Sequence, residues 1–188
     1  YNLYTDKSLG IVDYLAKQVK AGRIRHLGFS AHGSRAVMER FLNAYGKDME
    51  FCQIQLNYID TNYQAGIEGL KYAAQKGLGL AIMEPLLGGR LANPPKDILS
   101  ALGGKDPVQA ALDFLWDMPE VGVVLSGMSN LQQLEQNISY AEASSVGKLS
   151  EEEKAAMAKA KEIYDSKALV PCTRCAYCMP CPAGLNIP

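Results

Sequence analysis

Short apolar segments that alternate with helical ones are the feature that most limits the folds open to this chain of 188 residues. Four stretches have strand character, and each is followed by apolar residues at helical spacing. The expected strands span residues 26–30, 51–59, 78–83 and 121–125, and the expected helices span 8–21, 34–45, 65–76, 107–116 and a stretch from 131 onward. Such alternation produces parallel strands joined by helices, so we expect either a doubly wound sheet or a (β/α)8 barrel.

Local signals refine this outline. Asp106 before Pro107 marks a helix start, and Ser150 with Glu153 forms a capping box for a last helix to about residue 167. The segment 86–105 is rich in glycine and proline, and we expect it to be a long loop. The apolar faces of two helices are expected to comprise Val37, Met38, Phe41 and Leu42 in the first, and Leu131, Leu134 and Ile138 in the second.

Composition excludes several classes of function. The net charge is -1 and no basic block occurs, so neither nucleic acid nor an anionic membrane is an expected partner. No run of 18 apolar residues suggests a membrane span, and the first residues lack the pattern of a signal peptide. We therefore expect a cytoplasmic protein with reduced thiols, in which Cys52 is a small buried hydrophobe.

Polar residues follow the expected strands at their carboxyl ends. They are Ser30 with His32, Asn57 with Asp60, Glu84, and Ser126 with Ser129. In a barrel of parallel strands, this end carries the active site. No G-x-G-x-x-G motif follows any strand, which counts against a dinucleotide fold of the Rossmann kind.

Four of the five cysteines gather near the carboxyl terminus, between Pro171 and Pro182. They are Cys172, Cys175, Cys178 and Cys181, and two residues separate each from the next. This spacing and the closing Cys-Pro favour an iron–sulfur cluster, although the bacterial ferredoxin run has one more residue in its last gap. A structural zinc site is the second interpretation, but no second C-x2-C pair occurs elsewhere. A disulfide-bonded or disordered tail is the third, and two bridges within ten residues would be strained.

Four segments resemble the second half of an aldo/keto reductase, in family order and at family spacing. They are 22–30 (GRIRHLGFS), 53–58 (QIQLNY), 84–89 (EPLLGG) and 126–137 (SGMSNLQQLEQN). The cysteine run is similar to the ending of a subgroup with a ferredoxin-type [4Fe–4S] domain. The resemblance implies an NAD(P)H-dependent (β/α)8 TIM-barrel oxidoreductase that acts on a small-molecule carbonyl. It divides the chain into a half-barrel at 1–147, a linking helix at 148–168 and an iron–sulfur segment at 169–188.

The resemblance also implies nucleotide contacts. Ser30 and Gln53 match residues that hold the nicotinamide carboxamide. Met83 stands where many members stack a tyrosine on the nicotinamide ring, so the interpretations of a nicotinamide site, a flavin site and plain core packing stay open. The residues of the pyrophosphate loop are Ser126, Gly127, Met128 and Ser129, and Asn137 matches an adenine contact. Members that prefer NADPH carry Lys or Arg at the positions of Gly127 and Gln133, and both are uncharged here.

The family's catalytic Asp, Tyr, Lys and His come from strands that would precede Tyr1, so the resemblance assigns no catalytic residue. Tyr58 is expected to be a packing residue, and His32 is a weak candidate for a cofactor contact. Because four strands cannot close a barrel of eight, we expect a fragment that is inactive alone, with a homodimer of paired half-barrels as the alternative. In a second function class, the chain is a non-catalytic iron–sulfur scaffold for an electron-transfer partner. Nucleotide binding separates the two classes.

Overall fold

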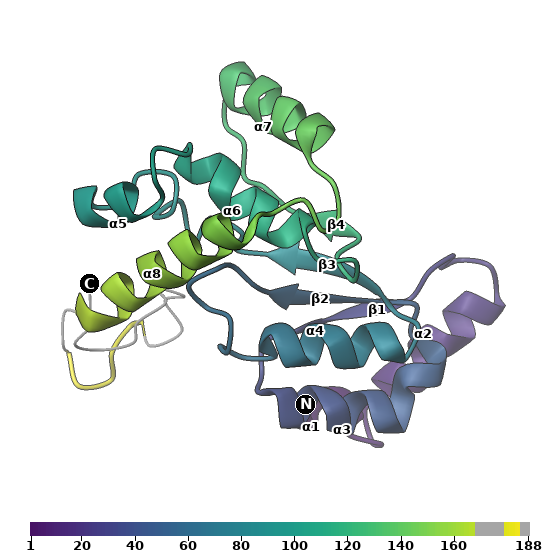
Figure 1. Ribbon diagram of the computed structural model, residues 1–188. Coiled ribbons are helices and arrows are strands. Elements are labelled where there is room, and N and C mark those ends of the chain that lie inside the picture. The colour runs from purple at the N-terminus through teal and green to yellow at the C-terminus, as the bar shows by residue number, and fades with distance from the viewer. Residues whose placement is uncertain (168–178, 185–188) are drawn as a thin grey trace.

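The computed structural model describes residues 1–167 and 179–184, and Figure 1 shows its helices and strands in chain order. The strands are β1 (Gly28–Ala31), β2 (Phe51–Gln55), β3 (Gly79–Met83) and β4 (Val123–Val124). The helices are α1 (Asn2–Thr5), α2 (Ile11–Lys20), α3 (Arg35–Tyr45), the 3-10 turn Gly46–Asp48, α4 (Gly66–Gln75), α5 (Lys96–Ala101), α6 (Pro107–Trp116), α7 (Leu131–Ala143) and α8 (Glu151–Lys167).

The four strands form one parallel sheet in the order β1-β2-β3-β4. This is the α/β arrangement that the sequence predicts, with a helix between each pair of neighbouring strands. Two strands are shorter than expected by three residues or more. The strand predicted over 51–59 ends at Gln55, because the Asn57 side chain accepts the backbone N–H groups of Ile59 and Asp60 and turns the chain. The strand predicted over 121–125 is reduced to two residues.

One hydrophobic core lies between the sheet and helices α2, α3 and α4. The strand residues that face these helices alternate with those that do not, as the two-residue period of a strand requires. The buried members from β2 and β3 are Cys52, Ile54, Leu80 and Ile82, each 2% exposed or less. Met38 and Leu42 of α3 pack here as predicted, but Val37 is exposed, so its predicted inward position is wrong.

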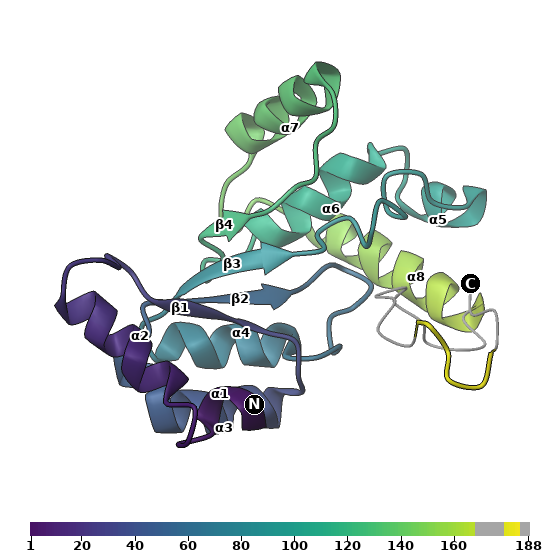
Figure 2. The same cartoon turned by 180° about the vertical axis from the view of Figure 1, so that it is seen from behind.

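A second core lies beyond the carboxyl ends of β2 and β3, where α5 and α8 pack together. Both strand arrowheads point toward these two helices in Figures 1 and 2. Its buried members include Tyr58, Ile59, Leu87, Leu91, Ile98, Leu102, Leu149, Met157 and Ala160. Helix α5 corrects one prediction, because the stretch 86–105 is a helix at residues 96–101 and not a loop throughout.

Helix α8 is held to the body by charged side chains as well. Lys105 Nζ lies 2.8 Å from Asp113 Oδ2 in α6 and 2.6 Å from Glu153 Oε1 in α8. Asp113 is 4% exposed, and burial of an unpaired carboxylate is costly, so Lys105 supplies a necessary partner. The predicted caps are present: Asp106 accepts the N–H groups of Val108 and Gln109, and Ser150 and Glu153 cap each other.

Helix α7 lies at the edge of the molecule beyond β4, where it contacts α6 (Figures 1 and 2). It has no buried residue. The apolar positions predicted from its helical spacing are exposed, Leu131 at 67%, Ile138 at 48% and Leu134 at 38%. Among residues 1–167 and 179–184, none of the helices combines the length and apolar character needed to span a bilayer.

Candidate functional site

The uncovered face of the sheet brings together three residues that the sequence singles out. Ser30 pairs with Gln53 in the β1–β2 register, and Gln55, two residues further along β2, pairs with Met83 of β3. Residues that pair in a parallel register point to the same face, and so do residues two apart in a strand. Ser30, Gln53 and Met83 therefore share the face opposite the helices. Ser30 is exposed there, and Gln53 and Met83 are half-buried.

The turn from β4 into α7 continues this face at the carboxyl end of the sheet. The Leu125 N–H donates to the Ile82 carbonyl at 2.9 Å, which places Ser126 beside the end of β3. The Asn137 Nδ2 donates to Ser126 Oγ at 2.9 Å. The Ser129 N–H and hydroxyl donate to Gln133 Oε1 at 2.8 and 3.1 Å. Four of the predicted nucleotide residues thus form two bonded pairs around the first turns of α7.

The start of α7 has features that suit a phosphate group and one that does not. Within the described residues, the N–H groups of Gly127 and Met128 have no hydrogen-bond partner, and a Cβ added at Gly127 would meet nothing within 4 Å. Free N–H groups at a helix start attract anions. However, the segment 106–147 contains no Lys, Arg or His. The start of α7 therefore suits a phosphate that is held by backbone N–H groups, but segment 106–147 has no cationic side chain to pair with that phosphate.

Asn57 joins the carboxyl ends of β2 and β3. Its side chain is fully buried. Its Nδ2 donates to the Glu84 carbonyl at 3.0 Å, while its Oδ1 accepts the Ile59 and Asp60 N–H groups at 3.0 and 2.8 Å. Glu84 has a φ of 55°, which is strained for a residue with a Cβ. Asn57 therefore fixes two strand ends and the loops that follow them.

Asp60 lies beside this junction and connects it to α8. Gln55 Nε2 donates to Asp60 Oδ2 at 2.9 Å. Burial raises the pKa of the Asp60 carboxyl, while the Gln55 hydrogen bond and the nearby charges of Arg90 and Lys161 oppose that shift. Lys161 of α8 also donates to the Ile59 carbonyl at 2.8 Å. The sequence marks Asp60 as a polar strand-end residue, but it offers no signal for partners that lie so far along the chain.

Two further candidates from the sequence have distinct positions. Tyr58 is 2% exposed and meets Phe114 edge to face at 6.3 Å, so the prediction of a packing residue is confirmed. Burial raises the pKa of Tyr58 to about 12. His32 is exposed just past the end of β1.

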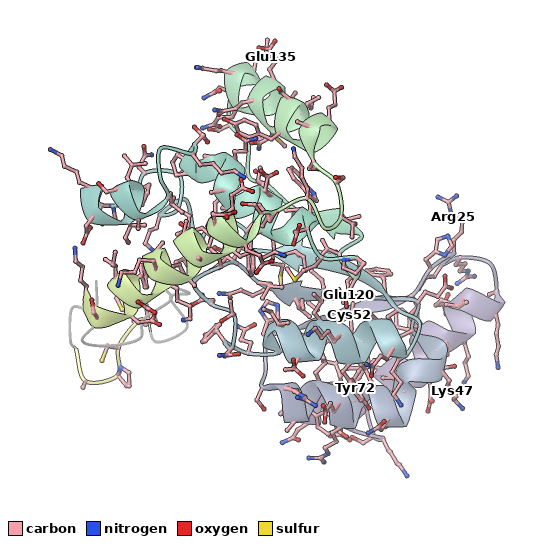
Figure 3. All side chains as sticks on the ribbon, viewed as in Figure 1. Arg25, Lys47, Cys52, Tyr72, Glu120 and Glu135 are labelled. Carbon is pink, nitrogen blue, oxygen red and sulfur yellow. The ribbon has the colours of Figure 1, made fainter. Side chains whose placement is uncertain are left out.

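Two of the five cysteines, Cys52 and Cys181, lie within the residues that the structure describes. Cys52 lies within the sheet (Figure 3), is fully buried, and has its pKa raised to about 12 by burial, which confirms a buried apolar role. Cys172, Cys175 and Cys178 lie outside the described residues. Cys181 is described and is a half-buried free thiol. Within the described ranges, no three His, Cys, Asp or Glu side chains gather in a way that could hold a metal ion.

Comparison with solved structures shows the same fold. The aldo-keto reductase AKR11C1 from Bacillus halodurans, in its apo form, is 19% identical with a TM-score of 0.68, and the match covers 83% of this chain and 58% of that one. The aldo/keto reductase from Klebsiella pneumoniae in complex with NADP and acetate is 24% identical with a TM-score of 0.61, over 82% of this chain and 53% of that one. The chain thus spans just over half the length of these proteins.

Comparisons with curated proteins and with family models gave different results. A search of the curated proteins found no match. The model described as the aldo/keto reductase family matches residues 2–162, which include the whole sheet, the junction at Asn57 and the start of α7. The match covers most of the chain, so this protein belongs to the aldo/keto reductase family.

Proposed function

We propose that this chain supplies the nucleotide-binding half of an NAD(P)H-dependent oxidoreductase site that reduces a small-molecule carbonyl. The observation that carries the proposal is the bonded arrangement of Ser126, Ser129, Gln133 and Asn137 around the exposed backbone of Gly127 and Met128. The enzyme from Klebsiella pneumoniae described as a complex with NADPH has the same fold at 22% identity, which supports a nucleotide of this class.

Each group of residues has a defined part in this proposal. Ser30 and Gln53 hold the nicotinamide carboxamide, for which an amide suits because it donates and accepts at once. Met83 packs its thioether against the nicotinamide ring. The N–H groups of Gly127 and Met128 receive the pyrophosphate, with Ser126 and Ser129 beside them, and Asn137 contacts adenine. The nucleotide supplies hydride to a carbonyl when it is bound, and these residues orient it.

Charge at the same loop sets the expected cofactor preference. NADPH differs from NADH by a phosphate that needs a cationic partner, and Gly127 and Gln133 provide none. We therefore propose that NADH binds at least as tightly as NADPH. The substitution Gln133→Arg should improve NADPH binding relative to NADH by about tenfold, since one charge-assisted hydrogen bond contributes roughly 1.5–3 kcal/mol.

Calorimetric titration of the purified chain with NADH and NADPH tests these proposals. Asn137→Ala should weaken NADH binding by about fivefold, which corresponds to roughly 1 kcal/mol for one lost hydrogen bond. Gln132→Ala is the matched control, because Gln132 is an exposed residue of α7 whose side chain makes no hydrogen bond within the described residues. Equal affinity in all variants, or no nucleotide binding by the folded chain, contradicts the proposed site.

We further propose that Cys172, Cys175, Cys178 and Cys181 hold a [4Fe–4S] cluster. The support is the spacing of the four thiols and the proline that follows, because thiolates at such intervals suit iron–sulfur clusters. Anaerobic purification with iron and sulfide analysis should give near-equal amounts of both and a visible absorbance that dithionite bleaches. Cys178→Ser should lose the cluster and Cys52→Ser should keep it. Bound zinc or a colourless protein would refute the cluster.

The cysteine run also supports a second candidate, a non-catalytic electron-transfer or scaffold module. In that case the cluster passes electrons to a partner protein and the half-barrel only supports it. The titration above separates the two candidates, because a cluster carrier without a reductase site should not bind NADH through the start of α7.

A further inference from the structure

A cavity of about 530 Å³ lies between α6, α8 and the segment that joins α5 to α6. This volume is within the range of small-molecule binding sites. The apolar part of its wall comes from Leu102, Leu149 and Met157, each 6% exposed or less. The residues assigned above to the nucleotide do not line this cavity. It is therefore separate from the proposed nucleotide site, and any ligand it takes goes beyond the proposed function.

The polar part of the wall is built around Lys105. Its Nζ lies 2.8 Å from Asp113 Oδ2 and 2.6 Å from Glu153 Oε1, and Glu153 Oε2 accepts the Ser150 N–H. The remaining carboxylate oxygen, Asp113 Oδ1, is buried and makes no hydrogen bond within the described residues. A buried acceptor without a donor is costly. One ammonium group thus faces two carboxylates, and one of their oxygens still needs a donor.

The other polar residues of the wall do not correct this imbalance. The ammonium group of Lys148 donates to the Ala143 carbonyl at the end of α7, and Glu152 adds a third carboxylate. The Gln109 side chain makes no hydrogen bond within the described residues, and its amide oxygen can accept one. The wall therefore holds three carboxylates and two ammonium groups, and one of the two ammonium groups is engaged elsewhere.

Helix starts are the one feature of the cavity that would favour an anion. Helices α6 and α8 both begin beside it, and the N–H groups of a first turn attract negative charge. In this protein those groups already have acceptors. Val108 and Gln109 donate to Asp106 Oδ1, and Glu153 donates to the Ser150 hydroxyl. The unmatched carboxylates therefore outweigh the helix starts, and the cavity favours a cation.

We propose that this cavity binds a small organic cation, namely a primary amine that carries an apolar chain. Its ammonium group lies beside Asp113 and Glu153 and balances the second carboxylate. The Gln109 amide oxygen accepts one of its N–H groups, and the apolar chain packs on Leu149 and Met157. A paired and hydrogen-bonded charge is the form in which a buried carboxylate is stable.

Nuclear magnetic resonance titration of the full chain tests this proposal with hexylamine as the probe. Hexylamine is protonated at pH 7, as a lysine side chain is. We expect saturable shifts of the Gln109 side-chain amide and Met157 methyl resonances. Hexanoate has the same chain length and the opposite charge, so it should bind at least about tenfold more weakly, because it cannot form the charge-assisted hydrogen bonds.

Two variants of α8 test the position of the amine, and each has a matched control. Ala156→Phe places a ring in the cavity and should weaken hexylamine binding at least about tenfold, whereas Ala158→Phe, at an exposed position of the same helix, should not. Glu153→Gln removes one carboxylate charge and should weaken binding about fivefold. Glu151→Gln removes a charge outside the cavity wall and should leave binding unchanged. Circular dichroism checks that each variant is folded.

Three results would overturn the proposal. The first is hexanoate binding as tightly as hexylamine, which would mean that the carboxylates do not select the ligand. The second is the same affinity for hexylamine in Ala156→Phe and Ala158→Phe. The third is a folded chain without a saturable shift at Gln109 and Met157, including the case in which the resonances at the start of α7 shift instead. Titration with NADH is a separate measurement, so failure here leaves the nucleotide site untouched.

Discussion

At the scale of single residues, fully buried side chains have contrasting roles in this protein. Cys52 and Asn57 are both fully buried, yet they act in opposite ways. The thiol is an apolar filler within the first core, whereas the amide satisfies three backbone groups at the edge of the second. Burial therefore makes the Cys52 thiol unreactive, whereas it makes the hydrogen bonds of Asn57 important for stability.

Cys52 should not react with iodoacetamide in the folded protein at pH 8. Its pKa of about 12 leaves roughly one thiol in ten thousand as the reactive thiolate, and the side chain is inaccessible. Mass spectrometry should detect alkylation at this position only after denaturation in urea. Fast labelling of Cys52 in the native protein would show that the first core opens readily.

Replacement of Asn57 by Leu should destabilise the chain by about 3 kcal/mol. The change leaves two buried N–H groups and the Glu84 carbonyl without partners, and each unsatisfied group costs roughly 1–3 kcal/mol. Urea unfolding followed by circular dichroism measures the loss. Asn93→Leu, at an exposed position, should change the free energy of unfolding by less than about 0.5 kcal/mol. Equal effects of the two changes would mean that Asn57 does not hold the strand ends.

Among the helices and strands, α8 depends most on pairing across long distances in the sequence. The Lys105 ammonium forms ion pairs with the buried Asp113 of α6 and with Glu153 in the first turn of α8. Lys105→Met should cost about 3–5 kcal/mol, the usual penalty for leaving one buried charge unpaired. Lys159→Met breaks an exposed pair with Glu162 and should cost at most about 1 kcal/mol. Similar losses in both variants would remove the special role of Lys105.

The same contact predicts a pH dependence. Lys105 lowers the pKa of Glu153 below its ordinary value of 4.5, with help from the Ser150 N–H. A carboxyl with a lowered pKa stabilises the folded state above 4.5, and this contribution is lost as pH falls through the folded-state value. Glu153→Gln should therefore be less stable than the parent at pH 7 and equally stable near pH 2. A constant difference across that range would contradict the ion pair.

The sequence predicts most of these elements because their signals are local. The strand at 78–83, the helix start at Asp106 and the capping box at Ser150 all depend on residues within a few positions of one another. Helix α5 escapes the same reasoning, because six helical residues lie in a segment full of glycine and proline. The apolar spacing of α7 correctly predicts a helix, but periodicity alone cannot tell whether its apolar residues are buried, and they are exposed. The partners of Asp60 and Asp113 are likewise out of reach, since only the fold brings them together.

For the molecule as a whole, the second core extends along α8 beyond the region that the family model matches. The family match stops at residue 162, inside α8, although Ile163 and Tyr164 still pack on the second core. The Arg90 guanidinium donates to the Tyr164 hydroxyl at 2.9 Å. Helix α8 therefore packs against the second core as far as its last turns.

Truncation of the chain tests the contribution of the second core to stability. A chain that ends at Lys167 keeps both cores and should unfold at the same urea concentration as the parent. A chain that ends at Gly147 loses Leu149 and Met157, whose burial contributes roughly 1.5–3 kcal/mol each, and should be largely unfolded. Equal midpoints for the two truncated chains would show that the second core adds no stability.

The absence of cationic residues from 106 to 147 has a consequence for the speed of binding. The charged side chains of that segment are all acidic; Asp113 and Asp117 form ion pairs with Lys105 and Lys154, and the others are Asp106, Glu120, Glu135 and Glu142. A dinucleotide that approaches the start of α7 is itself an anion, and added salt screens repulsion between like charges. Encounter should therefore become faster as ionic strength rises, the reverse of what a basic phosphate-binding site would show.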